Sequence, residues 1–166
     1  MVRECATALV ACLVSGCSLI LDFSGADTPP PDARYSQAEC DYKEPNDTRE
    51  TASMLGLSDT GPAAVCPKMA GVDDRDFYKV SVPANTLAKF QITYGFSATG
   101  DLDLQLTDAQ GSILASSRGF ANTETITCPG ASPPCAALAP GDYWLEVFPA
   151  QPGMANRYEL ALTITP

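Results

Sequence analysis

The chain has 166 residues, and its 20 Asp and Glu residues against 10 Lys and Arg residues give a formal net charge of −10. So large an excess of negative charge repels phosphate backbones and disfavours nucleic acid as a partner. The chain has no His, which excludes the Ser-His-Asp and Cys-His catalytic sets and the commonest zinc ligand. A hydrophobic content of 45% predicts a packed core, and 14 Pro and 12 Gly residues favour turns and short strands over long helices.

The chain begins with a segment typical of secretion. The apolar run at residues 5–14 is too short to cross a bilayer as a helix but fits the central part of a signal peptide. The sequence Val14-Ser15-Gly16-Cys17 resembles the box at which bacterial lipoproteins are cleaved and lipidated. A second match ends at Cys12 after a shorter apolar run, and an ordinary secretory signal is the other alternative. We predict a lipoprotein signal peptide over residues 1–16 and lipidation of Cys17.

Residues 17–39 are predicted to tether this lipid to a folded domain at residues 40–166. The tether contains Thr28-Pro29-Pro30-Pro31-Asp32 and shows no apolar period, and Pro-rich chains are extended and semi-rigid. The lipid on Cys17 makes a membrane the first expected partner, because several acyl chains hold a protein stably in a bilayer. In Gram-negative lipoproteins a serine after the lipidated cysteine, here Ser18, is associated with the outer membrane. We therefore expect a protein of the cell envelope, either periplasmic or surface-facing.

The cysteines that remain after the signal peptide and the lipid are Cys40, Cys66, Cys128 and Cys135. An even number outside the cytoplasm predicts two disulfides, for which three pairings are possible. We favour Cys40–Cys66 together with Cys128–Cys135, because the second pair closes a short Pro-rich loop between two strand-like segments. A four-cysteine zinc site is disfavoured because the chain contains no Cys-x-x-Cys pair.

Apolar residues alternate with polar ones along most of the chain after residue 76. Such a period of two is typical of strands with one buried face. Turn residues separate the alternating segments, and short strands at this spacing predict an all-β fold, an antiparallel β-sandwich. The alternating series are Tyr78, Val80 and Val82; Phe90, Ile92 and Tyr94; Leu102, Leu104 and Leu106; Tyr143, Leu145 and Val147; and Tyr158, Leu160, Leu162 and Ile164.

One short N-terminal helix is also predicted. Asp47 can cap it, and Glu50 stands three residues later, as in a capping box. Gly56 can end it.

The order of several short motifs resembles a known bacterial family. The motifs are Glu44-Pro45-Asn46-Asp47-Thr48, Asp74-Arg75-Asp76-Phe77-Tyr78-Lys79-Val80, Gly100-Asp101-Leu102-Asp103-Leu104, the turn at residues 108–111, Ile113-Leu114-Ala115-Ser116-Ser117, and Gly141-Asp142-Tyr143-Trp144-Leu145-Glu146-Val147. Together they resemble the bacterial pre-peptidase C-terminal domain and are similar to the collagen-binding domains of clostridial collagenases. The resemblance covers residues 40–165 and implies a jelly-roll-like β-sandwich.

The same resemblance implies a calcium site. Carried over residue by residue, it assigns the ligands to Glu44, Asn46, Asp47, Asp73 and Asp76. Carboxylate and amide oxygens are the ligands that calcium prefers. The alternative is that Asn46 and Asp47 cap the predicted helix, while Asp73 and its neighbours form a solvated turn.

Three aromatic residues are candidates for binding a ligand. If Tyr143 and its alternating partners face the core, Trp144 and Phe148 face outward on the same strand, and Phe77 does so on another. Outward aromatic side chains can form a surface that binds protein or polysaccharide. The alternative is that a loop or the Cys128–Cys135 segment covers them.

We do not expect an enzyme. Asp101 and Asp103 are the paired carboxylates that a glycosidase would need, but on one strand they project to one face, which indicates solvated strand residues. Ser116 and Ser117 have no evident base to activate them. The function that we expect is a non-catalytic, lipid-anchored binding module outside the cytoplasm. A structural envelope lipoprotein without a dedicated ligand is the alternative, and a carboxylate-based hydrolase is a remote one.

Overall fold

The computed structural model describes residues 43–58, 60–66, 74–95 and 100–165. Contacts between residues divide the chain into two units, residues 1–34 and 35–166. Only the second unit contains described residues. The predicted signal peptide, the tether with Cys17, and the site residues Cys40 and Asp73 lie outside the described residues. Within those ranges there is no helix that is long and apolar enough to span a membrane.

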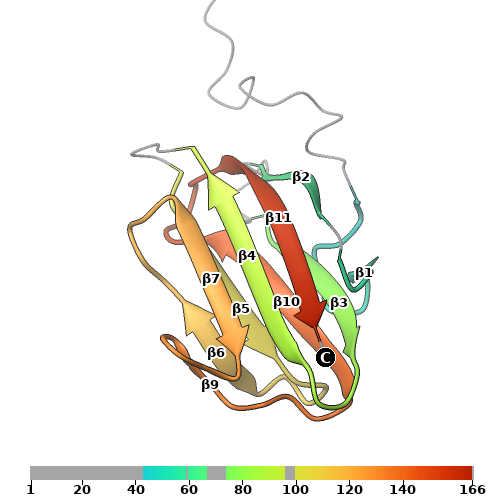
Figure 1. Ribbon diagram of the computed structural model, residues 1–166. Helices are drawn as coiled ribbons and strands as arrows, with labels where there is room; N and C mark the ends of the chain where they lie inside the picture. The colour runs from blue at the N-terminus through green and yellow to red at the C-terminus, as the bar shows by residue number, and fades with distance from the viewer. Residues whose placement is uncertain (1–42, 59, 67–73, 96–99, 166) are drawn as a thin grey trace, which may run out of the picture. The chain divides into compact units, whose positions relative to one another are not determined.

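The described residues form two packed sheets (Figure 1). The five-stranded sheet has the order β1-β3-β10-β5-β6, the four-stranded sheet has the order β2-β11-β4-β7, and β8 and β9 form a small separate pair. Among the described strands, β1 and β3 pair in parallel and all other pairs are antiparallel. The strands are β1 (Ser53–Leu55), β2 (Thr60–Val65), β3 (Asp76–Val82), β4 (Leu87–Tyr94), β5 (Leu102–Thr107), β6 (Ile113–Ser117), β7 (Thr123–Cys128), β8 (Gly130–Ala131), β9 (Pro134–Cys135), β10 (Gly141–Pro149) and β11 (Asn156–Thr165).

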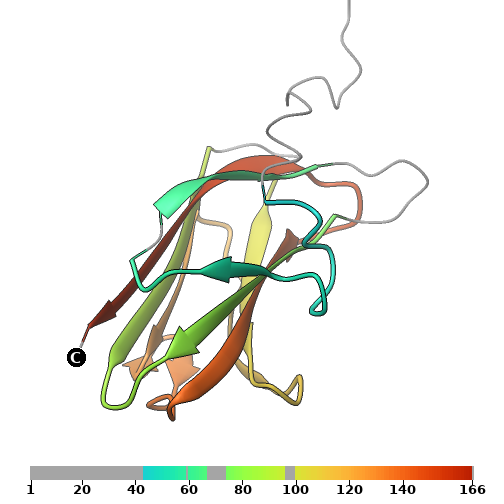
Figure 2. The ribbon, with the colours of Figure 1, turned by 90° about the vertical axis from the view of Figure 1, so that its right-hand side faces the viewer.

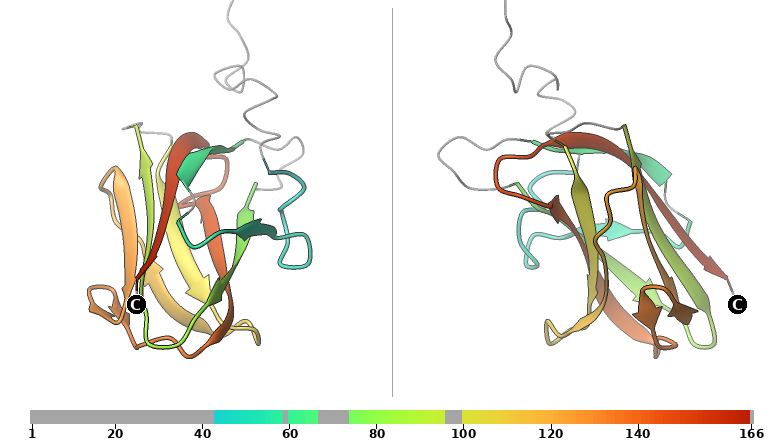
Figure 3. Two further views of the ribbon diagram at one scale, coloured as in Figure 1. Left: turned by 45° about the vertical axis from the view of Figure 1, so that its right-hand side comes forward. Right: turned by 90° about the vertical axis from the view of Figure 1, so that its left-hand side faces the viewer.

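The alternating residues of the sequence fill the space between the two sheets. In β4 the inward side chains are buried and most of the intervening ones are exposed, and β11 repeats this pattern. The alternation puts most of each strand's apolar residues on one face, so that the two sheets bury these residues against each other. The two turned views in Figure 3 show the layered arrangement of the strands. The predicted all-β sandwich is confirmed, and its largest fully buried side chains are Tyr78, Tyr158, Phe90, Ile92, Leu102, Leu104, Leu106, Ile126, Leu145, Leu162, Glu124 and Val65.

The predicted N-terminal helix is wrong. Residues 47–51 form bends and no helix, and the chain enters β1 at Ser53. The Thr48 and Thr51 side chains hydrogen-bond to each other at 3.0 Å, and Thr51 Oγ1 also accepts from the Thr48 backbone N–H at 3.2 Å. Such local bonds compete with helix formation. The parallel pairing of β1 with β3 then leaves too short a segment for a helix, whose nucleation is costly.

The predicted Cys128–Cys135 disulfide is confirmed, with Cα atoms 5.0 Å apart. It joins the end of β7 to β9, and both cysteines are buried against the core. Cys66 is disulfide-bonded as well. Its predicted partner Cys40 lies outside the described residues, so this pairing stays a prediction.

The central position of β10 predicts a large cost for truncating its core side chain Leu145. This residue has no exposed surface, so Leu145→Ala should lower the free energy of unfolding by about 3 kcal/mol. Urea denaturation measures the change. Leu87→Ala is the matched control because Leu87 is 43% exposed, and its effect should stay within about 0.5 kcal/mol. Equal costs for the two variants would contradict the assigned core.

Candidate functional site

Three carboxylates meet where β3 begins. One oxygen from each of Glu44, Asp74 and Asp76 lies within 4.8 Å of the others. Asp74 and Asp76 stand at the entry to β3, whereas Glu44 comes from the segment before β1. That segment reaches β3 because the Asn46 carbonyl accepts a hydrogen bond of 2.8 Å from the Phe77 N–H. In Figure 2 this segment, in cyan, passes the beginning of β3.

Each carboxylate of the cluster is held by hydrogen bonds. Asp74 Oδ2 accepts from the Cys66 backbone N–H at 2.7 Å, and Glu44 Oε2 accepts from the Asn46 N–H at 2.7 Å. Asp76 Oδ2 accepts from the Tyr158 hydroxyl, which lies 2.6 Å from the hydroxyl of Tyr78. The cluster is therefore connected both to the end of β2 and, through Tyr158 on β11, to the opposite sheet.

The environment of Asp76 disfavours its negative charge. The side chain is only 2% exposed, and this burial raises the pKa of its carboxyl well above the ordinary value. The hydrogen bond from Tyr158 lowers this pKa, whereas the charges of Asp74, Glu44 and Asp47 raise it further. Burial, followed by the charge of Asp76, raises the pKa of Tyr158. The carboxylates repel one another, and a bound cation would offset this repulsion.

The residues present fit a hard divalent cation. Asn46 is wholly buried, and one terminal atom of its side-chain amide lies 3.0 and 3.2 Å from the two Glu44 carboxylate oxygens. With its nitrogen toward Glu44, the amide donates to the carboxylate. With its oxygen toward Glu44, a cation is needed to hold the oxygens together. Carboxylates and an amide oxygen are donor types of a calcium site.

The structure brings together part of the predicted ligand set. Glu44, Asn46 and Asp76 lie at the cluster, and Asp47 is near enough to affect the pKa of Asp76. Asp73 lies outside the described residues. Asp74, which was not among the predicted ligands, belongs to the cluster, and its place two residues before Asp76 could have shown this, because such residues share one side of an extended chain.

The predicted aromatic surface lies on the outer face of the five-stranded sheet, but cationic side chains cover it. The Arg49 guanidinium lies 4.5 Å from the Trp144 ring centre, and the Lys79 ammonium lies 5.0 Å from it. The indole N–H of Trp144 also donates to the Arg49 carbonyl at 3.1 Å. Such cation–π contacts fix the positions of both partners.

Phe148 has the same kind of cover at the other end of β10. It is 5% exposed, with the guanidinium groups of Arg75 and Arg118 at 5.2 and 4.8 Å from its ring centre. The third predicted aromatic, Phe77, is half-buried on β3 and pairs with Glu146 in the strand register. The sequence analysis did not predict that cationic side chains cover these rings. Alternation could have indicated Lys79, because it points outward on β3 as Trp144 does on β10.

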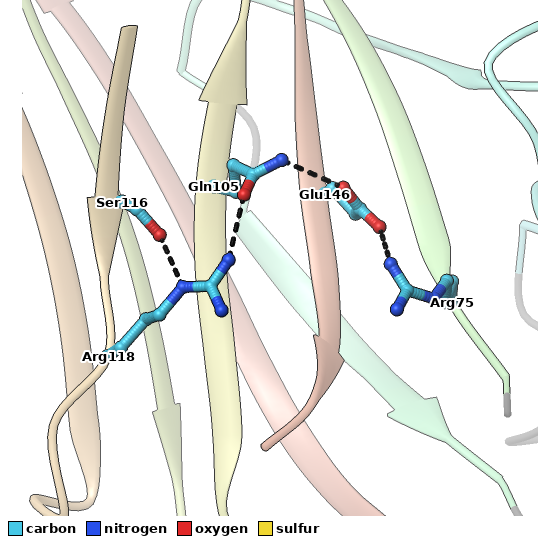
Figure 4. A network of polar contacts seen from close by, with 5 residues as sticks. All are labelled: Arg75, Gln105, Ser116, Arg118 and Glu146. Carbon is cyan, nitrogen blue, oxygen red and sulfur yellow. Dashed lines mark hydrogen bonds and ion pairs between the residues drawn. The ribbon is translucent and has the colours of Figure 1, made fainter. Parts of the chain in front are cut away.

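A polar network joins the two arginines across the sheet (Figure 4). Arg118 donates to Ser116 Oγ at 2.8 Å and to Gln105 Oε1 at 2.9 Å. Gln105 in turn donates to Glu146 Oε2 at 3.3 Å, and Glu146 forms an ion pair with Arg75. Since polar partners hold each guanidinium in place, the cover over Phe148 is pre-organised.

The expectation that Asp101 and Asp103 are both solvated is wrong for Asp103. This residue pairs with Phe148 in the strand register and is 5% exposed. Asp101 precedes β5 and accepts a hydrogen bond of 2.9 Å from the Tyr94 hydroxyl. Burial raises the pKa of Asp103 to about 6, the Arg118 charge lowers it, and the charges of Asp101 and Glu124 raise it. Covered in this way, Asp103 does not line an open cleft with Asp101.

The raised pKa of Asp103 predicts a pH-dependent stability. Between the unfolded pKa near 4 and the folded pKa near 6 the native state binds more protons, so stability contributed by this group falls as the pH rises from about 4 to about 7. Asp103→Asn should remove this decline. Denaturation curves of both proteins across this range measure the difference in unfolding free energy.

Asp142→Asn is the matched control for this experiment. Hydrogen bonds with Lys79 and then Ser81 lower the pKa of Asp142, so this group changes its proton binding below about pH 5. Its difference from wild type should be flat between about pH 5 and pH 7, where the contribution of Asp103 still falls. A flat difference for Asp103→Asn too would refute the assigned environment.

Residues 74–149 match the model of one protein family, the bacterial pre-peptidase C-terminal domain. No curated protein matches the chain significantly in sequence. Among solved structures, the pre-peptidase C-terminal domain of a collagenase from Bacillus anthracis is similar, with 18% identity, a TM-score of 0.49, and coverage of 69% of this chain and 94% of that chain. A periplasmic inhibitor of g-type lysozyme from Aeromonas hydrophila has 14% identity and a TM-score of 0.44 and covers 69% and 96% of the two chains. The family match over residues 74–149 confirms the resemblance that the motifs in this part of the chain predicted.

Proposed function

We propose that the protein is a non-catalytic accessory module that a lipid on Cys17 anchors to the cell envelope and that calcium stabilises. The observation that carries this proposal is the pre-peptidase C-terminal domain at residues 74–149. Such domains are in general accessory modules without catalysis. In this role the module contacts a protein or polysaccharide partner and leaves chemistry to other domains or proteins.

The carboxylate cluster supports calcium as the stabilising ion. Two of its three carboxylates, Asp74 and Asp76, are buried, and buried negative charges are stable only when they are neutralised or paired. Glu44, Asn46, Asp74 and Asp76 would hold the ion. When bound, calcium supplies positive charge and fixes the segment before β1 against the beginning of β3.

Calcium should therefore raise the thermal stability of the protein. At a concentration about ten times Kd, linkage gives about 1.4 kcal/mol of stabilisation, or about 5 °C in Tm. Asp76→Asn should abolish this shift because it removes a buried ligand charge. Scanning calorimetry with calcium and with chelator measures both effects.

Asp142→Asn serves as the control, because Asp142 pairs with Lys79 and is not one of the clustered carboxylates. Its calcium shift should equal that of wild type. Superimposable wild-type curves with calcium and with chelator would remove calcium from the proposal.

The outer face of the five-stranded sheet supports the contact with a partner. Trp144 is partly exposed, and its ring contacts the cationic groups of Arg49 and Lys79. Pre-organised aromatic and arginine side chains lose little conformational entropy on binding and are enriched among the residues that dominate interfaces. We therefore assign ligand binding to Trp144 and its cationic neighbours. The buried ring of Phe148 belongs to the packing of this face and not to the ligand surface.

Fractionation of cells tests the lipid anchor. Wild-type protein should be found with the membranes, and Cys17→Ala should move it to the soluble fraction, because the acyl chains supply the membrane affinity. Cys12→Ala is the control and should remain with the membranes. A membrane-bound Cys17→Ala protein would overturn the anchor.

The same membranes test the partner. Detergent-solubilised wild-type protein should retain an envelope protein or polysaccharide in a pull-down, and Trp144→Ala should lose it while remaining folded by circular dichroism. Self-association without a second component would instead favour the structural envelope lipoprotein.

A further inference from the structure

The buried Cys66 supports one side of the carboxylate cluster. It directly follows β2, is 8% exposed, and donates its backbone N–H to Asp74 Oδ2 at 2.7 Å. A hydrogen bond to a buried carboxylate is stronger than one between neutral groups and fixes the direction of the acceptor. The position of the Cys66 backbone thus determines where the Asp74 carboxylate lies.

Cys66 is also a point of covalent attachment. It is disulfide-bonded, whereas Cys128 and Cys135, the other cysteines of the described ranges, bond to each other. The partner of Cys66 therefore lies outside the described residues. Cys40, the partner that the sequence predicts, stands four residues before Glu44.

We propose that a Cys40–Cys66 disulfide is a positioning element of the cation site, and this rests on the proposed calcium function. The bridge joins the two arms that supply the ligands. One arm leads from Cys40 to Glu44, and the other passes from Cys66 through a backbone hydrogen bond to Asp74. Cys66 touches no cation in this scheme and acts only through Asp74.

The other attachments of the first arm show why the bridge matters. The arm contacts β3 through the bond between the Asn46 carbonyl and the Phe77 N–H, which lies on the far side of Glu44 from Cys40. With the bridge, the chain is fixed on both sides of Glu44, so less freedom is lost when the ion binds. Without it, Glu44 is held from one side, and the chain at Cys66 loses a covalent support beside the pairing of β2 with β11.

Two measurements on the full chain test the proposal. Mass spectrometry of peptides from the unreduced protein should find Cys40 linked to Cys66. Calorimetric titration with calcium should then give a Kd about tenfold weaker for Cys40→Ala/Cys66→Ala than for wild type, the usual loss when support of a metal ligand is removed. Cys128→Ala/Cys135→Ala is the matched control, because it removes a disulfide that joins β7 to β9, and its Kd should be that of wild type.

The outcomes separate this inference from the proposed function. A link from Cys66 to another cysteine, or equal Kd values for wild type and Cys40→Ala/Cys66→Ala, overturns the inference and leaves calcium binding in place. A wild-type protein that binds no calcium overturns both.

A measurement on wild-type protein covers the case in which the double variant does not fold. Hydrogen exchange at the Cys66 amide should slow when calcium is added, because the ion fixes the Asp74 acceptor. Exchange that is unchanged by calcium, in a protein that binds calcium, contradicts the coupling.

Discussion

The carboxylates of Asp74 and Asp76 are both buried at the entry to β3, close to a third carboxylate from Glu44. Desolvation and mutual repulsion oppose this arrangement, so the surrounding chain has to compensate for it. Part of the compensation is visible in hydrogen bonds from Cys66 to Asp74 and from Tyr158 to Asp76. A divalent cation would supply the rest, and this requirement is the basis of the calcium proposal.

Distant parts of the chain meet at this cluster. The segment before β1 contributes Glu44, the end of β2 contributes the Cys66 amide, and β11 contributes the Tyr158 hydroxyl. These elements come from both sheets, because β2 and β11 lie in the four-stranded sheet and β1 and β3 in the five-stranded one. A substitution in the cluster should therefore affect the contacts between the two sheets as well as the segment before β1.

Alternation of apolar residues was enough to predict β3, β4, β5, β10 and β11, because every second residue of each strand packs into the core. It did not identify β2, whose sequence from Thr60 to Val65 is made mainly of small residues. The helix prediction failed because capping residues also form turns, and long-range pairing of β1 decided between the two. The outward position of Trp144 followed from the sequence, but its cover by Arg49 and Lys79 depends on contacts between segments far apart in the chain. The burial of Asp103 was missed for the same reason, since Phe148 and Arg118 come from other parts of the chain.

Diffraction from crystals grown with calcium tests the central claim most directly. Anomalous scattering at a long wavelength should show one calcium peak among Glu44, Asp74 and Asp76, with the Asn46 side-chain oxygen turned toward it. A map without a peak there, in which the Asn46 amide nitrogen donates to Glu44 instead, would contradict the account, because the three carboxylates would then be stable together without a cation.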